Sequence, residues 1–350
     1  MPASPELGAE IRALIEREGP IPLTRFMALA NAQYYATRDP FGAGGDFVTA
    51  PEVSQMFGEL IGLALADVWQ RAERPSVAYV ELGPGRGTLA VDALRAMAKA
   101  GLTPPVHFVE TSPLLKDQQA ARLPAATWHE TIESLPADCP LLIVANEFFD
   151  ALPVRQLIST VTGWRERMVT IGPDDEFLLE PGRTLMDSLI PGHLLDAEPG
   201  GIVEQNPDAL VVMRALAERL ARQGGALLAI DYGHDGSRHG DTLQAIRAHA
   251  YADPLAKPGE SDLTAHVDFL ALEAAARAGG AEVAGPIEQG QWLVALGIAD
   301  RAAALARGAP ARGEEIAEAY RRLTHSDEMG RLFKVLAATA PEWPEVAGFA

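Results

Sequence analysis

The sequence predicts an α/β fold built on a mostly parallel β-sheet with helices on both faces. From Val77 onward, short and almost continuously apolar runs alternate with stretches of helical periodicity. Such runs are typical of strands that are buried on both faces of a parallel sheet. Apolar residues make up 48% of the chain and charged residues 22%, which is the composition of a globular protein. The 350 residues are enough for about two domains.

The net charge and the cysteine content disfavour some binding partners and exclude some kinds of site. The chain has 29 Lys and Arg against 48 Asp and Glu, a net charge of -19, which disfavours binding to nucleic acid or to an anionic membrane surface. Cys139 is the only cysteine, so no internal disulfide and no cysteine-based zinc site can form. No run approaches about 18 consecutive apolar residues, and residues 1–19 lack the pattern of a secretory signal or transit peptide. We therefore expect a protein of the reducing cytoplasm, without membrane insertion.

The N-terminal region, residues 1–75, is predicted to be helical. From Val53 to Trp69, apolar side chains recur at the i, i+3, i+4, i+7 spacing of one buried helical stripe. Pro51 and Glu52 suit the first turn of that helix, because proline is tolerated there and acids favour a helix N-terminus. The glycines within 41–47 predict a loop before it.

Residues 76–300 are predicted to hold the sheet. Strands are expected at 77–82, 106–110, just before Glu130, at 141–145 and at 226–231. A helix is expected from Thr88 to Ala100, because Gly101 follows directly. A short link between a strand near 282–284 and a last strand at 292–298 predicts one antiparallel hairpin at the sheet edge.

Two further segments depart from the alternation of strands and helices. Residues 153–224 lie between the fourth and fifth strands and are interpreted as an insertion. Its first part predicts a hairpin that turns near Thr162 and Gly163, and a stretch rich in Pro, Gly and acids follows. Residues 301–350 are predicted to form a mostly helical C-terminal extension.

The strongest local signal is the segment Glu81–Gly87, which joins a strand to the following helix. It contains Gly83, Pro84, Gly85 and Gly87. Glycines let a ligand approach the backbone closely, and the helix N-terminus offers unpaired N–H groups. A dinucleotide fold has G-x-G-x-x-G here, whereas this chain has G-x-G-x-G, with Thr88 in the place of the third glycine. The tighter turn, flanked by the acid Glu81, suits S-adenosylmethionine, which has no pyrophosphate; an ordinary glycine-rich turn is the alternative.

An acid at the end of the second strand adds to this interpretation. Glu110 stands 23 residues after Gly87, where a carboxylate can accept hydrogen bonds from both ribose hydroxyls. The alternative is a solvated glutamate at a strand end. Together with the glycine turn, Glu110 predicts that a nucleoside binds.

The segment Ala145–Pro153 is the candidate for chemistry. Ligands of open α/β sheets bind beyond the carboxyl ends of the strands, and Asn146 and Glu147 directly follow the fourth strand. Asn146 is expected to orient a substrate amine and Glu147 to hold a cation, while Phe148 and Phe149 exclude water. In the alternative interpretation, the polar side chains cap a turn and the aromatic rings belong to the core.

Other polar residues near strand ends have two interpretations each. His266, in the segment Asp262–Phe269, is either a base or substrate contact, or a structural histidine. Asp231 and Tyr232 end the fifth strand and line the same sheet edge. No group of His, Cys, Asp or Glu has metal-ligand spacing, so we expect no metal.

Several long segments, in order along the chain, resemble the MidA-like proteins, which are bacterial relatives of the mitochondrial complex I assembly-factor methyltransferase. The segments are Gly45–Gly62, Val80–Leu89, Val106–Leu115, Ala145–Gln156, Ile230–Gly233, Asp262–Phe269 and Met329–Ala337. The resemblance implies a class I S-adenosylmethionine-dependent methyltransferase fold with a Rossmann-like sheet. It also implies methylation of arginine in a protein substrate, with a respiratory complex subunit as one candidate.

The same resemblance implies positions for the cofactor. It places S-adenosylmethionine against Glu81, Gly83, Gly85 and Glu110, with adenine near Glu130. It also makes the N-terminal region part of a lid, with Gly45, Asp46 and Phe47 close to the cofactor.

Three other functions remain as alternatives. A small-molecule N- or O-methyltransferase would use the same cofactor site. A non-catalytic assembly protein would keep the fold and hold a partner through the insertion and an acidic surface. A nicotinamide-dependent oxidoreductase is disfavoured by Thr88, because it interrupts the dinucleotide glycine pattern.

Overall fold

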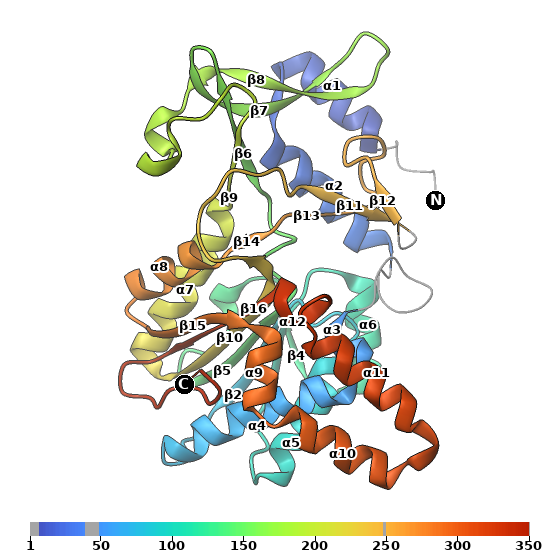
Figure 1. The fold of residues 1–350 in the computed structure, drawn as a ribbon, viewed down its shortest axis with the longest axis vertical. Coiled ribbons are helices and arrows are strands. Elements are labelled where there is room, and N and C mark those ends of the chain that lie inside the picture. The colour runs from blue at the N-terminus through green and yellow to red at the C-terminus, as the bar shows by residue number, and fades with distance from the viewer. Residues whose placement is uncertain (1–6, 39–48, 248–249, 350) are drawn as a thin grey trace. The chain divides into compact units, whose positions relative to one another are not determined.

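The computed structural model describes residues 7–38, 49–247 and 250–349, and the chain divides into two compact units (Figure 1). Unit 1 contains Met1–Phe47, Asp150–Ala209 and His234–Asp268, and unit 2 contains Val48–Phe149, Leu210–Gly233 and Phe269–Ala350. Each unit is therefore discontinuous in sequence. Among the described residues, no helix is both long and apolar enough to cross a membrane.

Unit 2 is built on a mixed sheet with the strand order β15-β16-β10-β5-β2-β3-β4. Strands β4, β3, β2, β5 and β10 run parallel to one another, and β16 runs antiparallel to both of its neighbours. The bounds are β2 (Ala78–Leu82), β3 (Val106–Val109), β4 (Thr127–His129), β5 (Leu141–Asn146), β10 (Gly225–His234), β15 (Glu282–Glu288) and β16 (Phe333–Thr339). The predicted α/β class and mostly parallel sheet are confirmed.

Helices of unit 2 pack on this sheet and on one another. Their bounds are α3 (Ala50–Val53), α4 (Gln55–Arg71), α5 (Thr88–Lys99), α6 (Pro113–Arg122), α7 (Pro207–Gln223, whose first residues belong to unit 1), α8 (Phe269–Ala278), α9 (Gln289–Ala295), α10 (Ile298–Gly308), α11 (Gly313–Thr324) and α12 (Met329–Leu332), with 3-10 turns η1 (Ile132–Ser134) and η4 (Pro310–Arg312). The stripe predicted from Val53 to Trp69 is interrupted at Ser54, which ends α3 and caps α4. The rest of it forms α4, where Phe57, Ile61 and Leu65 are fully buried. These side chains join Tyr79 of β2 in the main hydrophobic core.

Unit 1 combines two N-terminal helices with small antiparallel sheets. Its bounds are α1 (Leu7–Glu18), β1 (Ile21–Pro22), α2 (Leu23–Thr37), β6 (Arg155–Thr160), β7 (Gly163–Ile171), β8 (Phe177–Leu185), η2 (Asp187–Leu189), η3 (Gly192–Leu194), β9 (Ile202–Gln205), β11 (Gln244–Arg247), β12 (Ala250–Ala252), β13 (Asp262–Thr264) and β14 (Val267–Asp268). One sheet has the order β1-β7-β6-β9, with β8 paired to β7, and the other has the order β12-β11-β13. The predicted hairpin that turns at Thr162 and Gly163 is confirmed by the pairing of β6 with β7.

The predicted last strand at 292–298 is wrong. Residues 289–295 form helix α9, because a short apolar run fits a buried helix as well as a buried strand. Tertiary packing decides between them: a Cβ on Gly290 would lie 2.3 Å from the carbonyl oxygen of Thr324, so α9 packs tightly against the end of α11.

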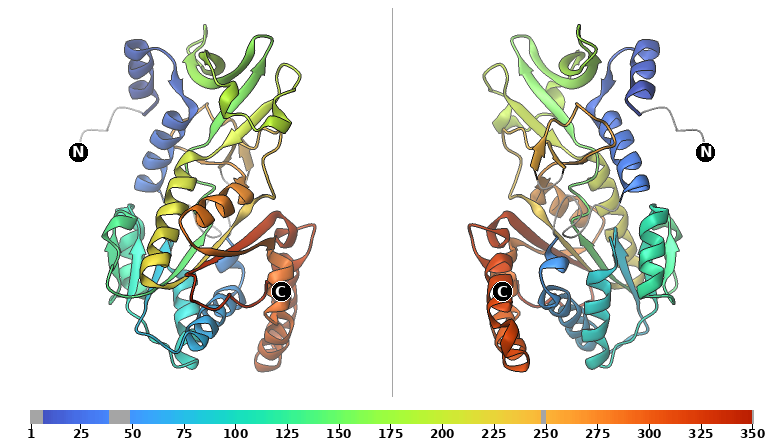
Figure 2. Two further views of the ribbon diagram at one scale, coloured as in Figure 1. Left: turned by 90° about the vertical axis from the view of Figure 1, so that its left-hand side faces the viewer. Right: turned by 90° about the vertical axis from the view of Figure 1, so that its right-hand side faces the viewer.

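The predicted antiparallel pairing at the sheet edge is confirmed, but the two strands do not form a hairpin, because helices α9 to α12 lie between them in the sequence. Strand β15 pairs antiparallel with β16 at Phe333–Thr339, and the red C-terminal strand lies within the sheet in the views of Figure 2. The C-terminal segment 301–350 is therefore not only a helical extension. All residues of β16 are buried, including the polar Lys334 and Thr339, so its sequence shows no strand alternation that would distinguish it from the helices around it.

The domain boundaries also differ from those predicted. The predicted region 1–75 is split, because α3 and α4 belong to unit 2 whereas α1 and α2 belong to unit 1. The predicted insertion 153–224 is split as well, because most of α7 returns to unit 2 and leads into β10. Its amphipathic pattern is that of a helix that connects two parallel strands, β5 and β10.

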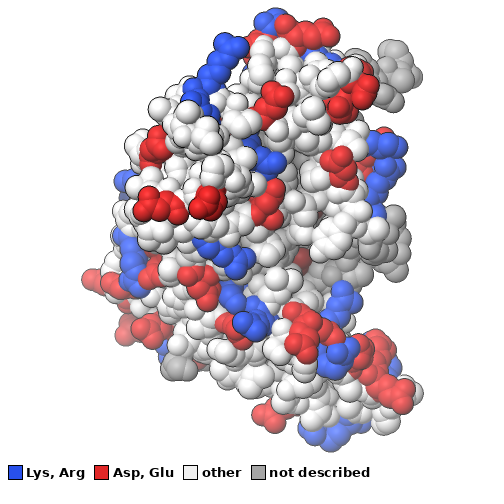
Figure 3. Space-filling model, turned by 45° about the horizontal axis from the view of Figure 1, so that its top comes forward, with Lys and Arg blue, Asp and Glu red and all other residues white. Residues whose placement is uncertain are grey.

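Charged side chains are interspersed on the face that Figure 3 shows. Acidic and basic groups alternate over that face, separated by uncharged surface. The net charge of -19 therefore forms no single acidic patch there.

Candidate functional site

The glycine turn after β2 is shaped for close contact with a ligand. Gly83, Gly85 and Gly87 all have positive φ, at 59°, 53° and 76°, a region that favours glycine. The N–H of Gly87 donates to the carbonyl of Pro84 (2.8 Å), which closes the turn. A Cβ on Gly83 would lie 3.3 Å from Cδ2 of Phe148. Gly87 is the N-cap of α5 and brings no capping side chain, and the first N–H groups of a helix can bind a polar or anionic ligand group.

Glu81 lies at the end of β2 and is only 3% exposed. The hydroxyl of Tyr79 donates to its Oε2 at 2.7 Å. Burial raises the pKa of Glu81 to about 8, although the hydrogen bond from Tyr79 acts in the opposite direction. At neutral pH the carboxyl group is therefore mostly protonated, and a cationic ligand group beside it would favour its ionised form.

Glu110 follows β3 and is held by three donors. Its Oε1 accepts the N–H groups of Thr111 (2.9 Å) and Ser112 (2.8 Å), and its Oε2 accepts from Nε2 of Gln119 (3.1 Å). Burial raises the pKa of Glu110, while these hydrogen bonds lower it. A carboxylate has about four lone-pair sites, so Oε2 keeps the capacity to accept from a further donor such as a ribose hydroxyl.

Gln119 is a residue of this site that sequence analysis missed. Its side chain, on α6, is fully buried and contacts the glycine turn, Glu110 and the indole of Trp128. The available signal was weak: Gln119 stands four residues after the buried Leu115, so it occupies the core face of its helix. A polar side chain on a core face needs polar partners, but the sequence does not identify them.

Asn146 and Glu147 lie at the carboxyl end of β5 in a constrained turn. Glu147 has φ 51°, which is uncommon for a residue with a side chain, and its N–H donates to the carbonyl of Ile230 (2.8 Å). Its Oε1 accepts from Nδ2 of Asn146 (3.0 Å) and from the N–H of Ala50 (3.3 Å). The buried Oδ1 of Asn146 has no hydrogen-bond partner among the described residues, so an acceptor is available to a ligand.

Asp231 fixes the turn that follows Glu147. It is fully buried at the end of β10, and its two carboxylate oxygens accept from the N–H groups of Phe149 and Tyr232, each at 3.0 Å. The rings of Phe148 and Phe149 meet edge to face with centroids 5.3 Å apart. Phe148 is thereby held against Gly83 of the glycine turn, which brings two segments predicted separately into one site.

A segment that precedes α4 also contacts the glycine turn. Thr88 Oγ1 donates to Oε1 of Glu52 (3.3 Å), and Arg86 forms an ion pair with the same carboxylate (3.7 Å). From the sequence, Glu52 was expected only to favour the start of a helix. The predicted cofactor contacts Gly45, Asp46 and Phe47 lie outside the described residues.

Two other predicted residues belong to other elements. Glu130 is exposed just after β4, the strand beside β3. His266 belongs to unit 1, where its N–H donates to Oγ1 of Thr242 (2.9 Å). Burial, with the nearby Arg238 and His234, lowers the pKa of His266 to about 4, so its ring is neutral at pH 7.

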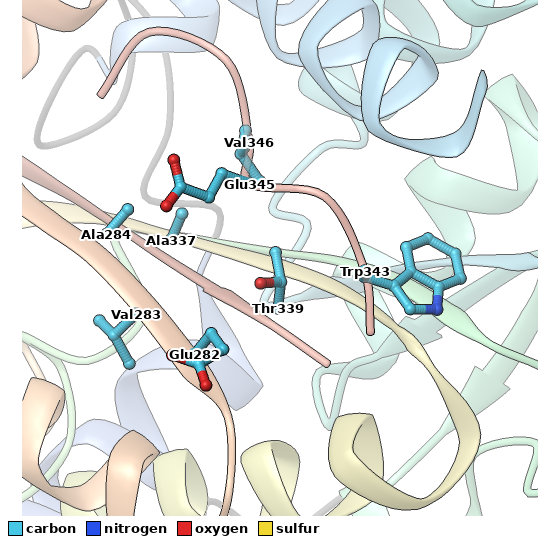
Figure 4. A pocket seen from close by; sticks show the side chains of 8 residues that line it. All are labelled: Glu282, Val283, Ala284, Ala337, Thr339, Trp343, Glu345 and Val346. Carbon is cyan, nitrogen blue, oxygen red and sulfur yellow. The ribbon is translucent and has the colours of Figure 1, made fainter. Parts of the chain in front are cut away.

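A cavity of about 260 Å³ lies at the opposite end of the sheet in unit 2 (Figure 4). It is lined by residues of β15, β16 and the C-terminal segment, among them Thr339 and Trp343. Thr339 pairs with Ala226 near the amino end of β10, whereas the glycine turn and Asn146 follow the carboxyl ends of β2 and β5. The cavity is therefore separate from the candidate site. Within the described ranges, no cluster of three or more His, Cys, Asp or Glu is arranged to hold a metal.

The residues of unit 2 fit an adenosyl ligand with an amino acid tail. The glycine turn gives backbone access that a Cβ would reduce at Gly83. Glu110 offers an acceptor for ribose, and Glu81 offers a carboxyl group for an amine. Oδ1 of Asn146, for which the described residues provide no hydrogen-bond partner, lies on the same sheet edge. These groups match the parts of S-adenosylmethionine, the ligand that the sequence predicts.

Comparisons with known proteins agree with this geometry. Residues 60–287 match a family described as "Putative S-adenosyl-L-methionine-dependent methyltransferase". The chain is 37% identical to the mitochondrial protein arginine methyltransferase NDUFAF7 homolog of Drosophila melanogaster, over 98% of this chain and 88% of that protein. It is 35% identical to NDUFAF7 of Homo sapiens, over 92% and 81%. A crystal structure from Burkholderia thailandensis with bound S-adenosyl-homocysteine has a TM-score of 0.86 and 30% identity, and covers 95% of this chain and 91% of that chain.

Proposed function

Because the chain belongs to this family of S-adenosyl-L-methionine-dependent methyltransferases, we propose that it methylates an arginine side chain of a protein. The observation that carries the proposal is the pair Asn146 and Glu147. A buried carbonyl oxygen with no partner among the described residues lies beside a carboxylate, at the end of β5 and next to the glycine turn. Two acceptors of this kind suit the N–H groups of a guanidinium. The relatives named above are protein arginine methyltransferases, which supports the same substrate class.

Different residues of unit 2 would bind different parts of the cofactor. When bound, S-adenosylmethionine supplies an electrophilic methyl group on a sulfonium sulfur. Glu110 would bind the ribose hydroxyls, the glycine turn would accommodate the amino acid tail, and Glu81 would bind its amine. Glu130, exposed at the end of the strand next to Glu110, is proposed to contact the adenine.

Catalysis by methyl transfer depends mainly on orientation, because the displacement requires the attacking nitrogen in line with the methyl group. Glu147 and Asn146 would accept hydrogen bonds from the guanidinium and hold its positive charge away from the attacking nitrogen. Phe148, held by the turn that Asp231 caps, would exclude water. His266, neutral at pH 7, remains a proposed base or substrate contact.

For the substrate protein and the cellular compartment, only a class can be proposed. A protein substrate follows from the activity, and a respiratory complex subunit is the first candidate because the relatives in animals are mitochondrial. A cytoplasmic location stays a prediction, supported by the single cysteine of the chain.

Two measurements test the proposal. Titration calorimetry with S-adenosylhomocysteine should show binding by the wild-type protein and none by Gly85→Val, because a β-branched side chain at positive φ fills the turn. Transfer of labelled methyl to arginine should fall at least a hundredfold in Glu147→Gln, with ligand affinity within threefold of wild type.

The controls separate enzyme from assembly protein. Gly308→Ala, at a helix end with open space around the added Cβ, should keep both binding and transfer. A wild-type protein that binds the cofactor and partners but transfers no methyl group would contradict the enzymatic proposal, and transfer to a small molecule alone would contradict the protein substrate.

A further inference from the structure

We propose that Gln119 is a positioning residue that sets the ribose-binding geometry of the cofactor site. The inference rests on the proposed function, in which Glu110 accepts hydrogen bonds from the ribose. Gln119 does not need to touch the ligand for this role. It acts by holding Glu110 and the glycine turn in one fixed arrangement.

The side-chain amide of Gln119 joins three separate segments of unit 2. Its Nε2 donates to the carbonyl oxygen of Gly85 (2.7 Å) and to Oε2 of Glu110 (3.1 Å). Its Oε1 accepts from the indole N–H of Trp128 on β4 (2.8 Å). The turn after β2, the end of β3 and the edge strand β4 therefore converge on one fully buried amide.

Its partners allow this amide only one orientation. A carbonyl oxygen and a carboxylate can only accept, whereas the indole nitrogen can only donate. Turning the amide over would place its oxygen against two acceptors and its NH₂ against a donor. Both N–H bonds of Nε2 are used, so the side chain has one arrangement that satisfies all partners.

These hydrogen bonds hold the side chain of Glu110 in one rotamer, with Oε2 directed to the ligand. Oε1 is held by the N–H groups of Thr111 and Ser112, and Oε2 is held on one side by Gln119. The remaining lone pair of Oε2 then has a fixed direction. Because Gln119 also holds the carbonyl of Gly85, that direction is fixed relative to the glycine turn, which in the proposed function accommodates the amino acid tail.

Recognition of the ribose hydroxyls should therefore depend on Gln119, while other parts of the ligand should depend on it less. We expect the wild-type protein to bind S-adenosylhomocysteine at least tenfold more tightly than its 2′-deoxy analogue. In Gln119→Leu this preference should fall below threefold, mainly through weaker binding of S-adenosylhomocysteine. Trp128→Phe, which removes only the indole donor, should give an intermediate preference.

Calorimetry on the full chain, with both ligands, tests the inference. Gln118→Leu, on the same helix and next to Gln119, is the matched control and should keep the wild-type preference. Circular dichroism and the thermal midpoint report whether each variant is folded. If Gln119→Leu does not fold, Trp128→Phe alone decides, because an unchanged preference in that variant would contradict the role.

The Glu110→Gln variant distinguishes the ribose-binding role of Glu110 from the positioning role of Gln119. A wild-type protein without preference for the ribose 2′-hydroxyl, or a Glu110→Gln variant that keeps it, would overturn the ribose role of Glu110 within the proposed function. Loss of preference in Glu110→Gln, together with full preference in folded Gln119→Leu, would overturn only the inference about Gln119. Equal weakening of both ligands in Gln119→Leu would show a merely structural residue and would also overturn it.

Discussion

Glu81 illustrates how one residue can connect burial with ligand binding. Its carboxyl group is 3% exposed and has Tyr79 as its hydrogen-bond donor. Burial disfavours the charged form, which explains a pKa of about 8. Sequence analysis could predict an acid at this place, because it flanks the glycine turn, but could not predict that the acid is protonated at neutral pH.

This raised pKa predicts that affinity for S-adenosylhomocysteine increases with pH. If the ligand amine binds the ionised Glu81, affinity should rise by up to about tenfold per pH unit between pH 6 and 8 and level off above. Calorimetry across this range measures the change. Glu81→Gln should bind more weakly and without that pH dependence, and a flat profile of the wild-type protein would exclude Glu81 as the amine ligand.

Glu147, a residue of the candidate site, has a strained backbone conformation. Its φ of 51° lies in the left-handed region, which costs a residue with a Cβ roughly 1–3 kcal/mol at functional sites. The surrounding contacts maintain it, because its N–H and carboxylate are both held. The sequence marks this residue as polar after a buried strand but gives no sign of the strained conformation.

We expect Glu147→Gly to be more stable than Glu147→Ala by about 1 kcal/mol, because glycine adopts positive φ without steric cost. Both variants lack the carboxylate, so their comparison isolates the backbone term. Urea unfolding gives the two free energies. Equal stability of the two variants would contradict strain at this position.

At the scale of elements, the packing of α4 on α5 depends on glycine. A Cβ on Gly62 would lie 2.3 Å from the carbonyl oxygen of Ala93 and 2.7 Å from its Cα. Both contacts are with backbone, so a larger residue requires the helices to move apart. The sequence predicts α4 from its apolar stripe, but its spacing does not reveal that one face must be this close to a second helix.

Gly62→Ala should therefore destabilise the protein by about 2 kcal/mol or more, although alanine favours a helix by about 1 kcal/mol relative to glycine. Gly308→Ala is the matched control, because nothing lies within 4 Å of the added Cβ near the end of α10. Thermal unfolding of both variants tests this. A Gly62→Ala variant as stable as wild type would show that the two helices can separate at little cost.

Elements also show where prediction from sequence fails. The strands that carry the glycine turn, Glu110 and Asn146 are predicted within a residue or two, because each has a local apolar pattern followed by polar or glycine residues. Residues 292–298 were predicted as a strand, and residues 333–339 as part of a mostly helical segment. Both differ in the structure, because a short segment rich in apolar residues fits a buried helix as well as a buried strand. Their conformation depends on neighbours far away in sequence: the end of α11 for α9, and β10 for β16.

At the scale of the whole molecule, contacts between distant parts of the sequence hold unit 2 together. Glu59 of α4 is 4% exposed and accepts two hydrogen bonds from Arg301 of α10, at 2.7 and 2.8 Å, and one from Arg95 of α5, at 3.1 Å. Burial opposes ionisation of Glu59, but the bonds with Arg301 and Arg95 lower its pKa overall. This network attaches the C-terminal helices to the helices that cover the sheet.

Glu59→Gln should destabilise the protein by about 3 kcal/mol at pH 7, because two guanidinium groups then share a neutral partner. Since the pKa of Glu59 is lowered in the folded protein, its contribution is full above the unfolded pKa of about 4.5 and is lost as the pH falls through the folded value. Urea unfolding at pH 7 and at acidic pH measures both effects. Glu318→Gln, which breaks an exposed pair with Arg321, is the control and should leave stability unchanged.

The sequence by itself determined the fold class, the parallel strands and most of the candidate site in unit 2. These features are local: an apolar run forms a strand, the polar or glycine residues after it lie at its carboxyl end, and parallel strands place those ends at one sheet edge. The tertiary structure decided which distant segments complete this site and its support. Three features depend on contacts between residues remote in sequence. They are the pairing of β16 with β10, the division of 1–75 and 153–224 between two units, and the convergence of Gly85, Glu110 and Trp128 on Gln119. Such contacts leave only a buried polar residue or a short apolar run in the sequence, and neither pattern specifies its partner.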